Sequence, residues 1–158
     1  MTKEQKQQFT LRITQANKTG LVVILYEITL AFLEDALEEF EREDWKAYKS
    51  SIYKARDCLD ELLESLNTRY EPGMLLRSLY HYYKKEITSA AILRNTEKLL
   101  PVMDMIRELK DSYEKIAEQD TSAPLMENTQ TVYAGLTYGR GCLNENLADQ
   151  GTDRGFRI

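Results

Sequence analysis

"LVVILYEITLAFLEDALEEF", residues 21–40, is the stretch that decides the fold. It opens with six consecutive apolar residues, and six neighbours on a helix of about 3.6 residues per turn point in every direction. At roughly 100° per residue the apolar arc spans roughly 220°, about twice the arc that an ordinary surface helix buries. Glu27 interrupts this run, which is too short to span a bilayer. The stretch therefore predicts a helix, residues 18–42, with more apolar surface than one core face needs.

The apolar side chains of this helix form two neighbouring stripes. The first stripe consists of Leu21, Leu25, Ile28 and Phe32. The second stripe consists of Val22, Tyr26, Leu30, Leu33 and Leu37. Either other helices cover both stripes, or one stripe packs into a core and the other binds a partner. The second stripe has the i, i+3, i+4, i+7 spacing by which a helix is recognised in an apolar groove, so we expect it to bind the partner.

Three further segments show helical spacing of apolar residues, at residues 44–66, from Pro72 to about residue 90, and from about residue 95 to residue 117. Asp44 is a suitable N-cap, and Pro72 suits a first helical turn. Four amphipathic helices joined by short loops predict an all-α fold, an antiparallel up-down four-helix bundle over residues 18–119. In the third helix Leu75 and Tyr82 lie on a face beside the core seam, where they are further candidates for contact with a partner.

The two flanks have a different character. Residues 1–17 are polar except for Phe9, Leu11 and Ile13, whose alternation predicts an extended strip with its apolar side chains on one side. This strip lies directly before the long helix, so it is a candidate cover for a bare apolar groove. Residues 120–158 hold five of the seven glycines and lack helical periodicity, so we expect a tail.

Composition excludes several classes of function. The net charge of −5 disfavours nucleic-acid binding and docking on an anionic membrane. The polar N-terminal residues hold no apolar signal core. Two cysteines, Cys58 and Cys142, make neither a disulfide framework nor a CxxC motif, which favours a reduced, cytoplasmic protein. With one histidine, the chain supplies no ligand set for a di-iron or zinc site, so we expect no metal or cofactor.

A catalytic constellation is also not visible. His81 is the one candidate general base, but it stands between Tyr80 and Tyr82 without a serine or cysteine nucleophile motif. The glycines at 135, 139 and 141 match neither phosphate-loop pattern. We therefore expect a binding protein rather than an enzyme.

Four successive segments resemble the FliS family of flagellin-specific export chaperones. The first is "ITQANKTGLVVILYEITLAFLEDA", residues 13–36, in which Leu25-Tyr26-Glu27 matches the leucine-tyrosine-acid core of the family. The others are "ARDCLDELLESLN", "LYHYYKKEITSA" and "LRNTEKLLPVMDMIRELKDSYEKI", which follow in order at matching spacing. The chain departs from the family at Asn17-Lys18-Thr19-Gly20, where many members have Ser-Pro followed by two acidic residues, and at His81, which replaces an acidic residue.

The resemblance implies a cytoplasmic chaperone that binds the disordered C-terminal region of flagellin. It prevents premature polymerisation and delivers its client for type III export, where the export-gate protein is a further partner. The resemblance also implies that the N-terminal segment, here with Phe9, Leu11 and Ile13, covers part of the groove in the free state. The alternative from the residues alone is a structural helical bundle whose spare stripe forms a homodimer without a flagellin client.

Overall fold

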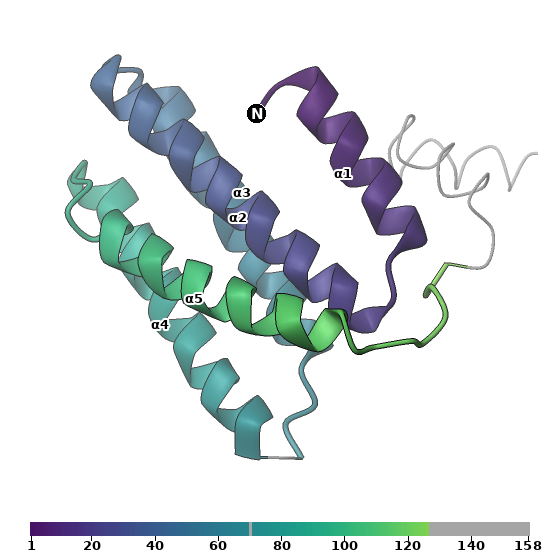
Figure 1. The fold of residues 1–158 in the computed structure, drawn as a ribbon. Coiled ribbons are helices and arrows are strands. Elements are labelled where there is room, and N and C mark those ends of the chain that lie inside the picture. The colour runs from purple at the N-terminus through teal and green to yellow at the C-terminus, as the bar shows by residue number, and fades with distance from the viewer. Residues whose placement is uncertain (70, 127–158) are drawn as a thin grey trace, which may run out of the picture.

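The computed structural model describes residues 1–69 and 71–126, and within those residues the chain is helical without strands, as predicted. Five helices follow one another along the chain (Figure 1). They are α1 (Lys3–Gln15), α2 (Lys18–Glu41), α3 (Trp45–Ser65), α4 (Glu71–Leu93) and α5 (Leu99–Ala117). The bounds of α2 and α3 agree closely with the ranges that the sequence predicts.

Local signals explain where these helices begin. The Asn17 side chain accepts a hydrogen bond from the Gly20 amide at 2.8 Å, which satisfies one of the free N–H groups at the start of α2. Asp44 does the same for α3 by accepting from the Ala47 amide at 3.0 Å. Pro101 lies in the first turn of α5, where a missing N–H costs nothing.

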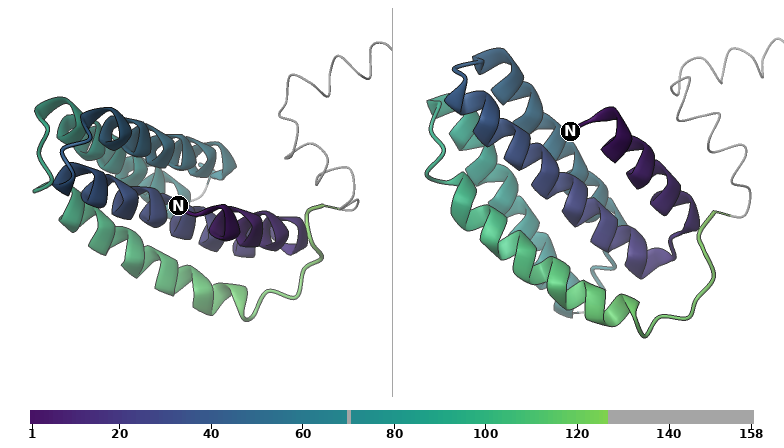
Figure 2. Two further views of the ribbon diagram at one scale, coloured as in Figure 1. Left: turned by 90° about the horizontal axis from the view of Figure 1, so that it is seen from above. Right: turned by 45° about the horizontal axis from the view of Figure 1, so that its top comes forward.

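Helices α2 to α5 share one hydrophobic core. Helix α2 packs against α3 and α5, and α4 packs against the same two helices (Figures 1 and 2). The largest fully buried side chains come from all four helices: Tyr26, Tyr48, Tyr80, Tyr83, Leu33, Ile52, Leu59, Leu62, Ile87, Leu99, Met103 and Ile106. The apolar seams of α3, α4 and α5 therefore face α2 and one another.

The N-terminal segment is a helix, and the expectation of an extended strip is wrong. Thr2 accepts a hydrogen bond from the Gln5 amide, and the Gln5 side chain accepts one from the Thr2 amide, which forms a capping box. Phe9 and Ile13 lie four residues apart and are half-buried, whereas Leu11 is 56% exposed. Three alternating apolar residues fit a helix as well as a strand, because the first and third share a helical face.

After α5 the chain returns towards the start of α2. The Asn17 side chain donates a hydrogen bond to the Asp120 carbonyl at 3.0 Å, and the Leu125 amide donates to the Ala16 carbonyl at 3.0 Å. Residues 121–126 thus lie against the connection between α1 and α2. The predicted tail continues through residues 127–158, which lie outside the described part of the chain.

The burial of the second stripe leads to a stability prediction. Leu33→Ala should lower the free energy of unfolding by about 2–5 kcal/mol, because it leaves a cavity between α2 and its neighbours. Urea unfolding followed by circular dichroism measures this change. The matched control is Leu11→Ala on α1, which should stay within about 0.5 kcal/mol of the parent because Leu11 is exposed. Equal effects from both substitutions would contradict the assignment of the core.

Candidate functional site

The second stripe of α2 belongs to the core rather than to an open groove. Tyr26 and Leu33 are 0% exposed, and Leu30 is also buried. Their side chains are covered by α3, α4 and α5 in this conformation, so a partner reaches them only if the helices rearrange, and their role in binding stays a prediction. Val22 and Leu37, at the two ends of the stripe, are half-buried and pack against the same core.

Tyr26 lies at the centre of a group of buried phenols. Its hydroxyl hydrogen-bonds to the Tyr80 hydroxyl, and its ring meets the Tyr113 ring edge-on, with centroids 5.7 Å apart. Burial raises the pKa of both Tyr26 and Tyr80 well above the ordinary value, because a phenolate would lose its hydration there. The two phenols are therefore neutral, and their hydrogen bond satisfies polar groups that would otherwise be costly to bury.

The first stripe of α2 is the one that stays partly open. Leu21, Leu25, Ile28 and Phe32 are all half-buried, and none belongs to the fully buried core. On the α3 side the Lys54 ammonium lies 5.7 Å from the centre of the Phe32 ring. The sequence distinguishes the two stripes, and the structure buries the middle of the second stripe more deeply than the first, of which Leu25 and Phe32 also pack against the core.

Helix α1 covers the part of α2 beside this open stripe. Val23 and Ile24 are buried, yet they lie outside the main core cluster. They line a hollow of about 490 Å³ together with Arg12, Gln15 and other residues of α1, α2 and α5. Among the described helices, α1 contacts α2 alone, and it lies beside α2 in both figures (Figures 1 and 2). Val23 and Ile24 are thus apolar residues that depend on α1 for part of their cover.

The attachment of α1 is mostly polar. Both terminal nitrogens of the Arg12 guanidinium donate to the Glu27 carboxylate, one of them at 2.9 Å, and this hydrogen bonding raises the pKa of Arg12. The Met1 amine pairs with Asp35 further along α2. The Arg12–Glu27 pair is exposed, and an exposed ion pair contributes only about 0.2–1 kcal/mol, whereas the Met1–Asp35 pair is partly buried. Thr14 is the single buried residue of α1. Helix α1 is therefore held more weakly than the four helices of the core.

The residues predicted as a groove cover occupy α1 unevenly. Phe9 and Ile13 are half-buried, and the Arg12 guanidinium lies 5.8 Å from the centre of the Phe9 ring. Leu11 is on the solvent side of the helix. A covering role for Phe9 and Ile13 fits their position and stays a prediction, whereas Leu11 covers nothing in this conformation.

The candidates on α4 are exposed. Leu75 and Tyr82, with Met74 beside them, are large apolar side chains at the surface. Tyr82 is supported from one side by the Tyr83 ring, with centroids 6.0 Å apart. Both candidates remain available to a partner, and their role stays a prediction.

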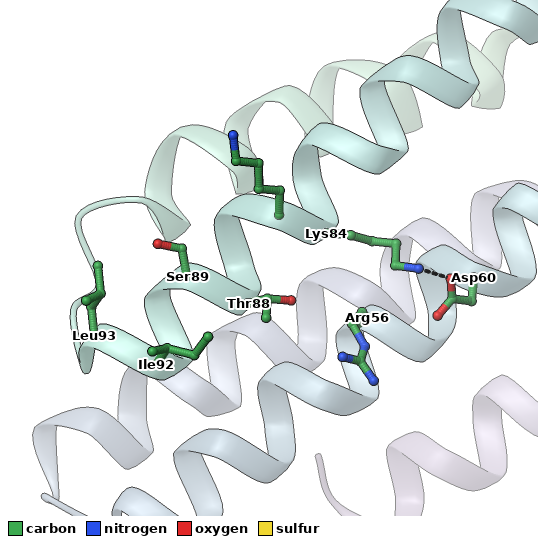
Figure 3. Close-up of a pocket in the computed structure, with 8 residues that line it drawn as sticks. Arg56, Asp60, Lys84, Thr88, Ser89, Ile92 and Leu93 are labelled. Carbon is green, nitrogen blue, oxygen red and sulfur yellow. Dashed lines mark hydrogen bonds and ion pairs between the residues drawn. The ribbon is translucent and has the colours of Figure 1, made fainter.

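A cleft between α3 and α4 is a feature that the sequence does not predict. It has a volume of about 660 Å³ and is lined by residues of these two helices, among them Arg56, Asp60 and Lys84 (Figure 3). Its residues are spread over two segments without a motif, so no sequence signal pointed to it.

The features that bear on catalysis or on a membrane are the histidine, possible metal ligands and possible membrane spans of the described residues. His81 is exposed. Across residues 1–69 and 71–126, no three His, Cys, Asp or Glu side chains gather as a metal site would require. Nor does any helix of this part have the length and hydropathy for a membrane span.

Comparison with known proteins gives a consistent result. The model of a family described as flagellar protein FliS matches residues 1–120, which include all five described helices. The flagellar secretion chaperone FliS of Bacillus subtilis (strain 168) is 22% identical over 108 residues, which is 68% of this chain and 81% of that protein.

The polar attachment of α1 predicts that this helix opens first. In hydrogen exchange of the whole chain, the amides of α1 should exchange faster than those of α2 and α3, because few apolar contacts protect them. Arg12→Ala should accelerate exchange in α1 further. Arg42→Ala is the matched control, since it removes the ion pair with Glu38 without touching α1. If the amides of α1 exchanged as slowly as those of α3, the prediction would be wrong, and α1 would be a fixed part of the core.

Proposed function

Since this chain belongs to the FliS family of flagellar proteins, we propose that it is a cytoplasmic flagellar secretion chaperone for flagellin. In this proposal it binds the disordered C-terminal region of flagellin, prevents premature polymerisation and delivers the client for type III export. The name of the Bacillus subtilis relative supports the chaperone role. The export-gate protein is a further partner in this proposal.

The observation that carries the proposal is the open stripe of α2, which lies beside a weakly held helix. When α1 moves away, Ile24 becomes continuous with the half-buried stripe of Leu21, Leu25, Ile28 and Phe32. These positions have the i, i+3, i+4, i+7 spacing on which a helical segment docks. Fully burying an aliphatic or aromatic side chain contributes roughly 1.5–3 kcal/mol, and half-buried ones contribute about half of that. The stripe therefore supplies several kcal/mol towards the cost of ordering a client.

Helix α1 gives this surface a reversible cover. A bare apolar stripe favours aggregation, and α1 reduces this by shielding Val23 and Ile24 in the free chain. A client that binds α2 competes with α1, so the cover lowers affinity by the free energy that holds α1 in place. The exposed Arg12–Glu27 ion pair adds only a small part of that penalty, so a client can overcome it.

We place a second client contact on α4. Leu75 and Tyr82 are exposed and lie seven residues apart, two turns along one helical face. In this arrangement the antiparallel bundle formed by α2 to α5 is the rigid support, and one client can contact it on α2 and on α4. Two separate contacts on one disordered chain raise affinity through effective concentration.

The alternative is a structural protein that self-associates. The exposed apolar residues of α4, Met74 and Leu75, are the observation that favours it, because such residues are common in subunit interfaces. Sedimentation at low micromolar concentration separates the two functions. A dimer that persists when a flagellin C-terminal peptide is added would support the structural role over the chaperone role.

Binding of a flagellin C-terminal peptide tests the client site. Ile28→Asp should weaken this binding by about tenfold or more in calorimetry, because it places a charge in the apolar stripe. Ile116→Asp on α5 is the matched control at an exposed apolar position, and it should bind like the parent. Circular dichroism of both variants checks that they are folded. Unchanged binding by Ile28→Asp would reject α2 as the client surface.

Loosening α1 should have the opposite effect on the same measurement. Arg12→Ala removes the ion pair with Glu27, so it should strengthen peptide binding by about twofold to fivefold, the equivalent of about 0.4–1 kcal/mol. The Arg42→Ala variant should leave the affinity unchanged. Weaker binding by Arg12→Ala would show that α1 holds the client instead of competing with it.

A further inference from the structure

The cleft between α3 and α4 is lined by charged, polar and apolar side chains. Three of its side chains are cationic, Arg56, Lys84 and Lys85, against the single carboxylate of Asp60. The whole chain carries a net charge of −5, so this local excess of positive charge is opposite in sign to the rest of the molecule. Figure 3 shows Lys84 reaching across from α4 to Asp60 on α3, with Arg56 beside them.

The Arg56 side chain can donate a further hydrogen bond to an acceptor. Its guanidinium carbon lies 4.7 Å from the centre of the Tyr53 ring, which limits the positions that the side chain can take. Its Nε atom is buried and has no hydrogen-bond partner within the described residues. A buried donor without a partner is costly, and a carboxylate that accepted from it would relieve that cost with a charge-assisted hydrogen bond.

The other end of the cleft is apolar and open. Ile92 is 70% exposed and Leu93 is 64% exposed, although both are large aliphatic residues at the end of α4. In Figure 3 they lie at the end of the cleft away from Asp60, while Thr88 stands between the two ends. From Lys84 to Leu93 the helix rises about 13 Å, or about two and a half turns, so the charged and the apolar ends match the length of a short helix.

From this arrangement we propose that the cleft between α3 and α4 binds an acidic amphipathic segment of a partner protein. Carboxylates of that segment pair with Arg56 and Lys85, and its aliphatic side chains pack on Ile92 and Leu93. Charge complementarity selects the acidic segment, and the apolar end distinguishes it from a simple inorganic anion. All the lining residues come from α3 and α4, and none of them is among the α2 residues, or is Leu75 or Tyr82 of α4, that we assign to flagellin. A chaperone with both sites can hold its client while it docks on another protein.

A labelled peptide tests this site on the full chain. The probe is a designed amphipathic peptide of about 15 residues, about four helical turns, with glutamates at one end and leucines at the other. Its counterpart has lysines in place of the glutamates. Fluorescence anisotropy should show that the acidic peptide binds at least about tenfold more tightly than the basic one, with the difference shrinking at high salt. Equal binding of the two peptides would overturn the proposal.

Paired variants locate the binding. Arg56→Gln combined with Lys85→Glu should weaken binding of the acidic peptide by about tenfold or more. Arg77→Glu is the matched control, because Arg77 is an exposed cation of α4 that does not line the cleft. Ile92→Ser should also weaken binding, whereas Ile116→Ser should not. An equal loss with Arg77→Glu would mean that general charge attraction, rather than the cleft, binds the peptide.

Backbone amide shifts in NMR complete the test. The acidic peptide should move signals of residues 53–60 and 84–93 and leave those of residues 21–32 in place. Shifts confined to α2 would overturn the proposal. So would shifts at the cleft that grow with protein concentration alone, because they would identify a second copy of the chain as the occupant. The flagellin client experiment does not depend on these outcomes, so the two proposals can fail independently.

Discussion

The orientation of α2 about its own axis is the constraint on which the rest of the structure depends. This helix has apolar side chains over most of its circumference, and only one stripe can occupy the centre of the core. Tyr26 and Leu33 occupy it, and the Tyr26 hydroxyl fixes the arrangement through its hydrogen bond to Tyr80 on α4. A phenol buried at this depth needs a polar partner, which ties the rotation of α2 to the position of α4.

Once that stripe is buried, Val23 and Ile24 on another side of α2 still have to be shielded from solvent. Helix α1 provides part of this cover, and its attachment to α2 includes the Arg12–Glu27 ion pair. The connection between α1 and α2 is in turn fixed by Asn17 and by the residues that follow α5. The result is a four-helix core with a weakly held helix on one side, which is the arrangement that the proposed chaperone function requires.

Several features of this architecture were predictable because they depend on neighbouring residues. The caps Asn17 and Asp44 determine where α2 and α3 begin, and the regular seam of α3 identifies its buried face. The helical nature of residues 3–15 was not predictable from the alternation of Phe9, Leu11 and Ile13, because the pattern is too short to separate a helical from an extended period. The signal for a helix was present in the capping box of Thr2 and Gln5.

By itself the sequence determined that the chain from residue 18 to residue 117 is mainly helical, where α2 and α3 begin, that α2 carries two apolar stripes, and which family it resembles. These properties follow from residue spacing and local hydrogen bonds along one segment. Only the tertiary structure decided which stripe of α2 is buried, because that depends on how α3, α4 and α5 pack around it. The tertiary structure also brought Arg56 and Lys84 to one cleft, since residues of separate helices become neighbours only when the helices pack together.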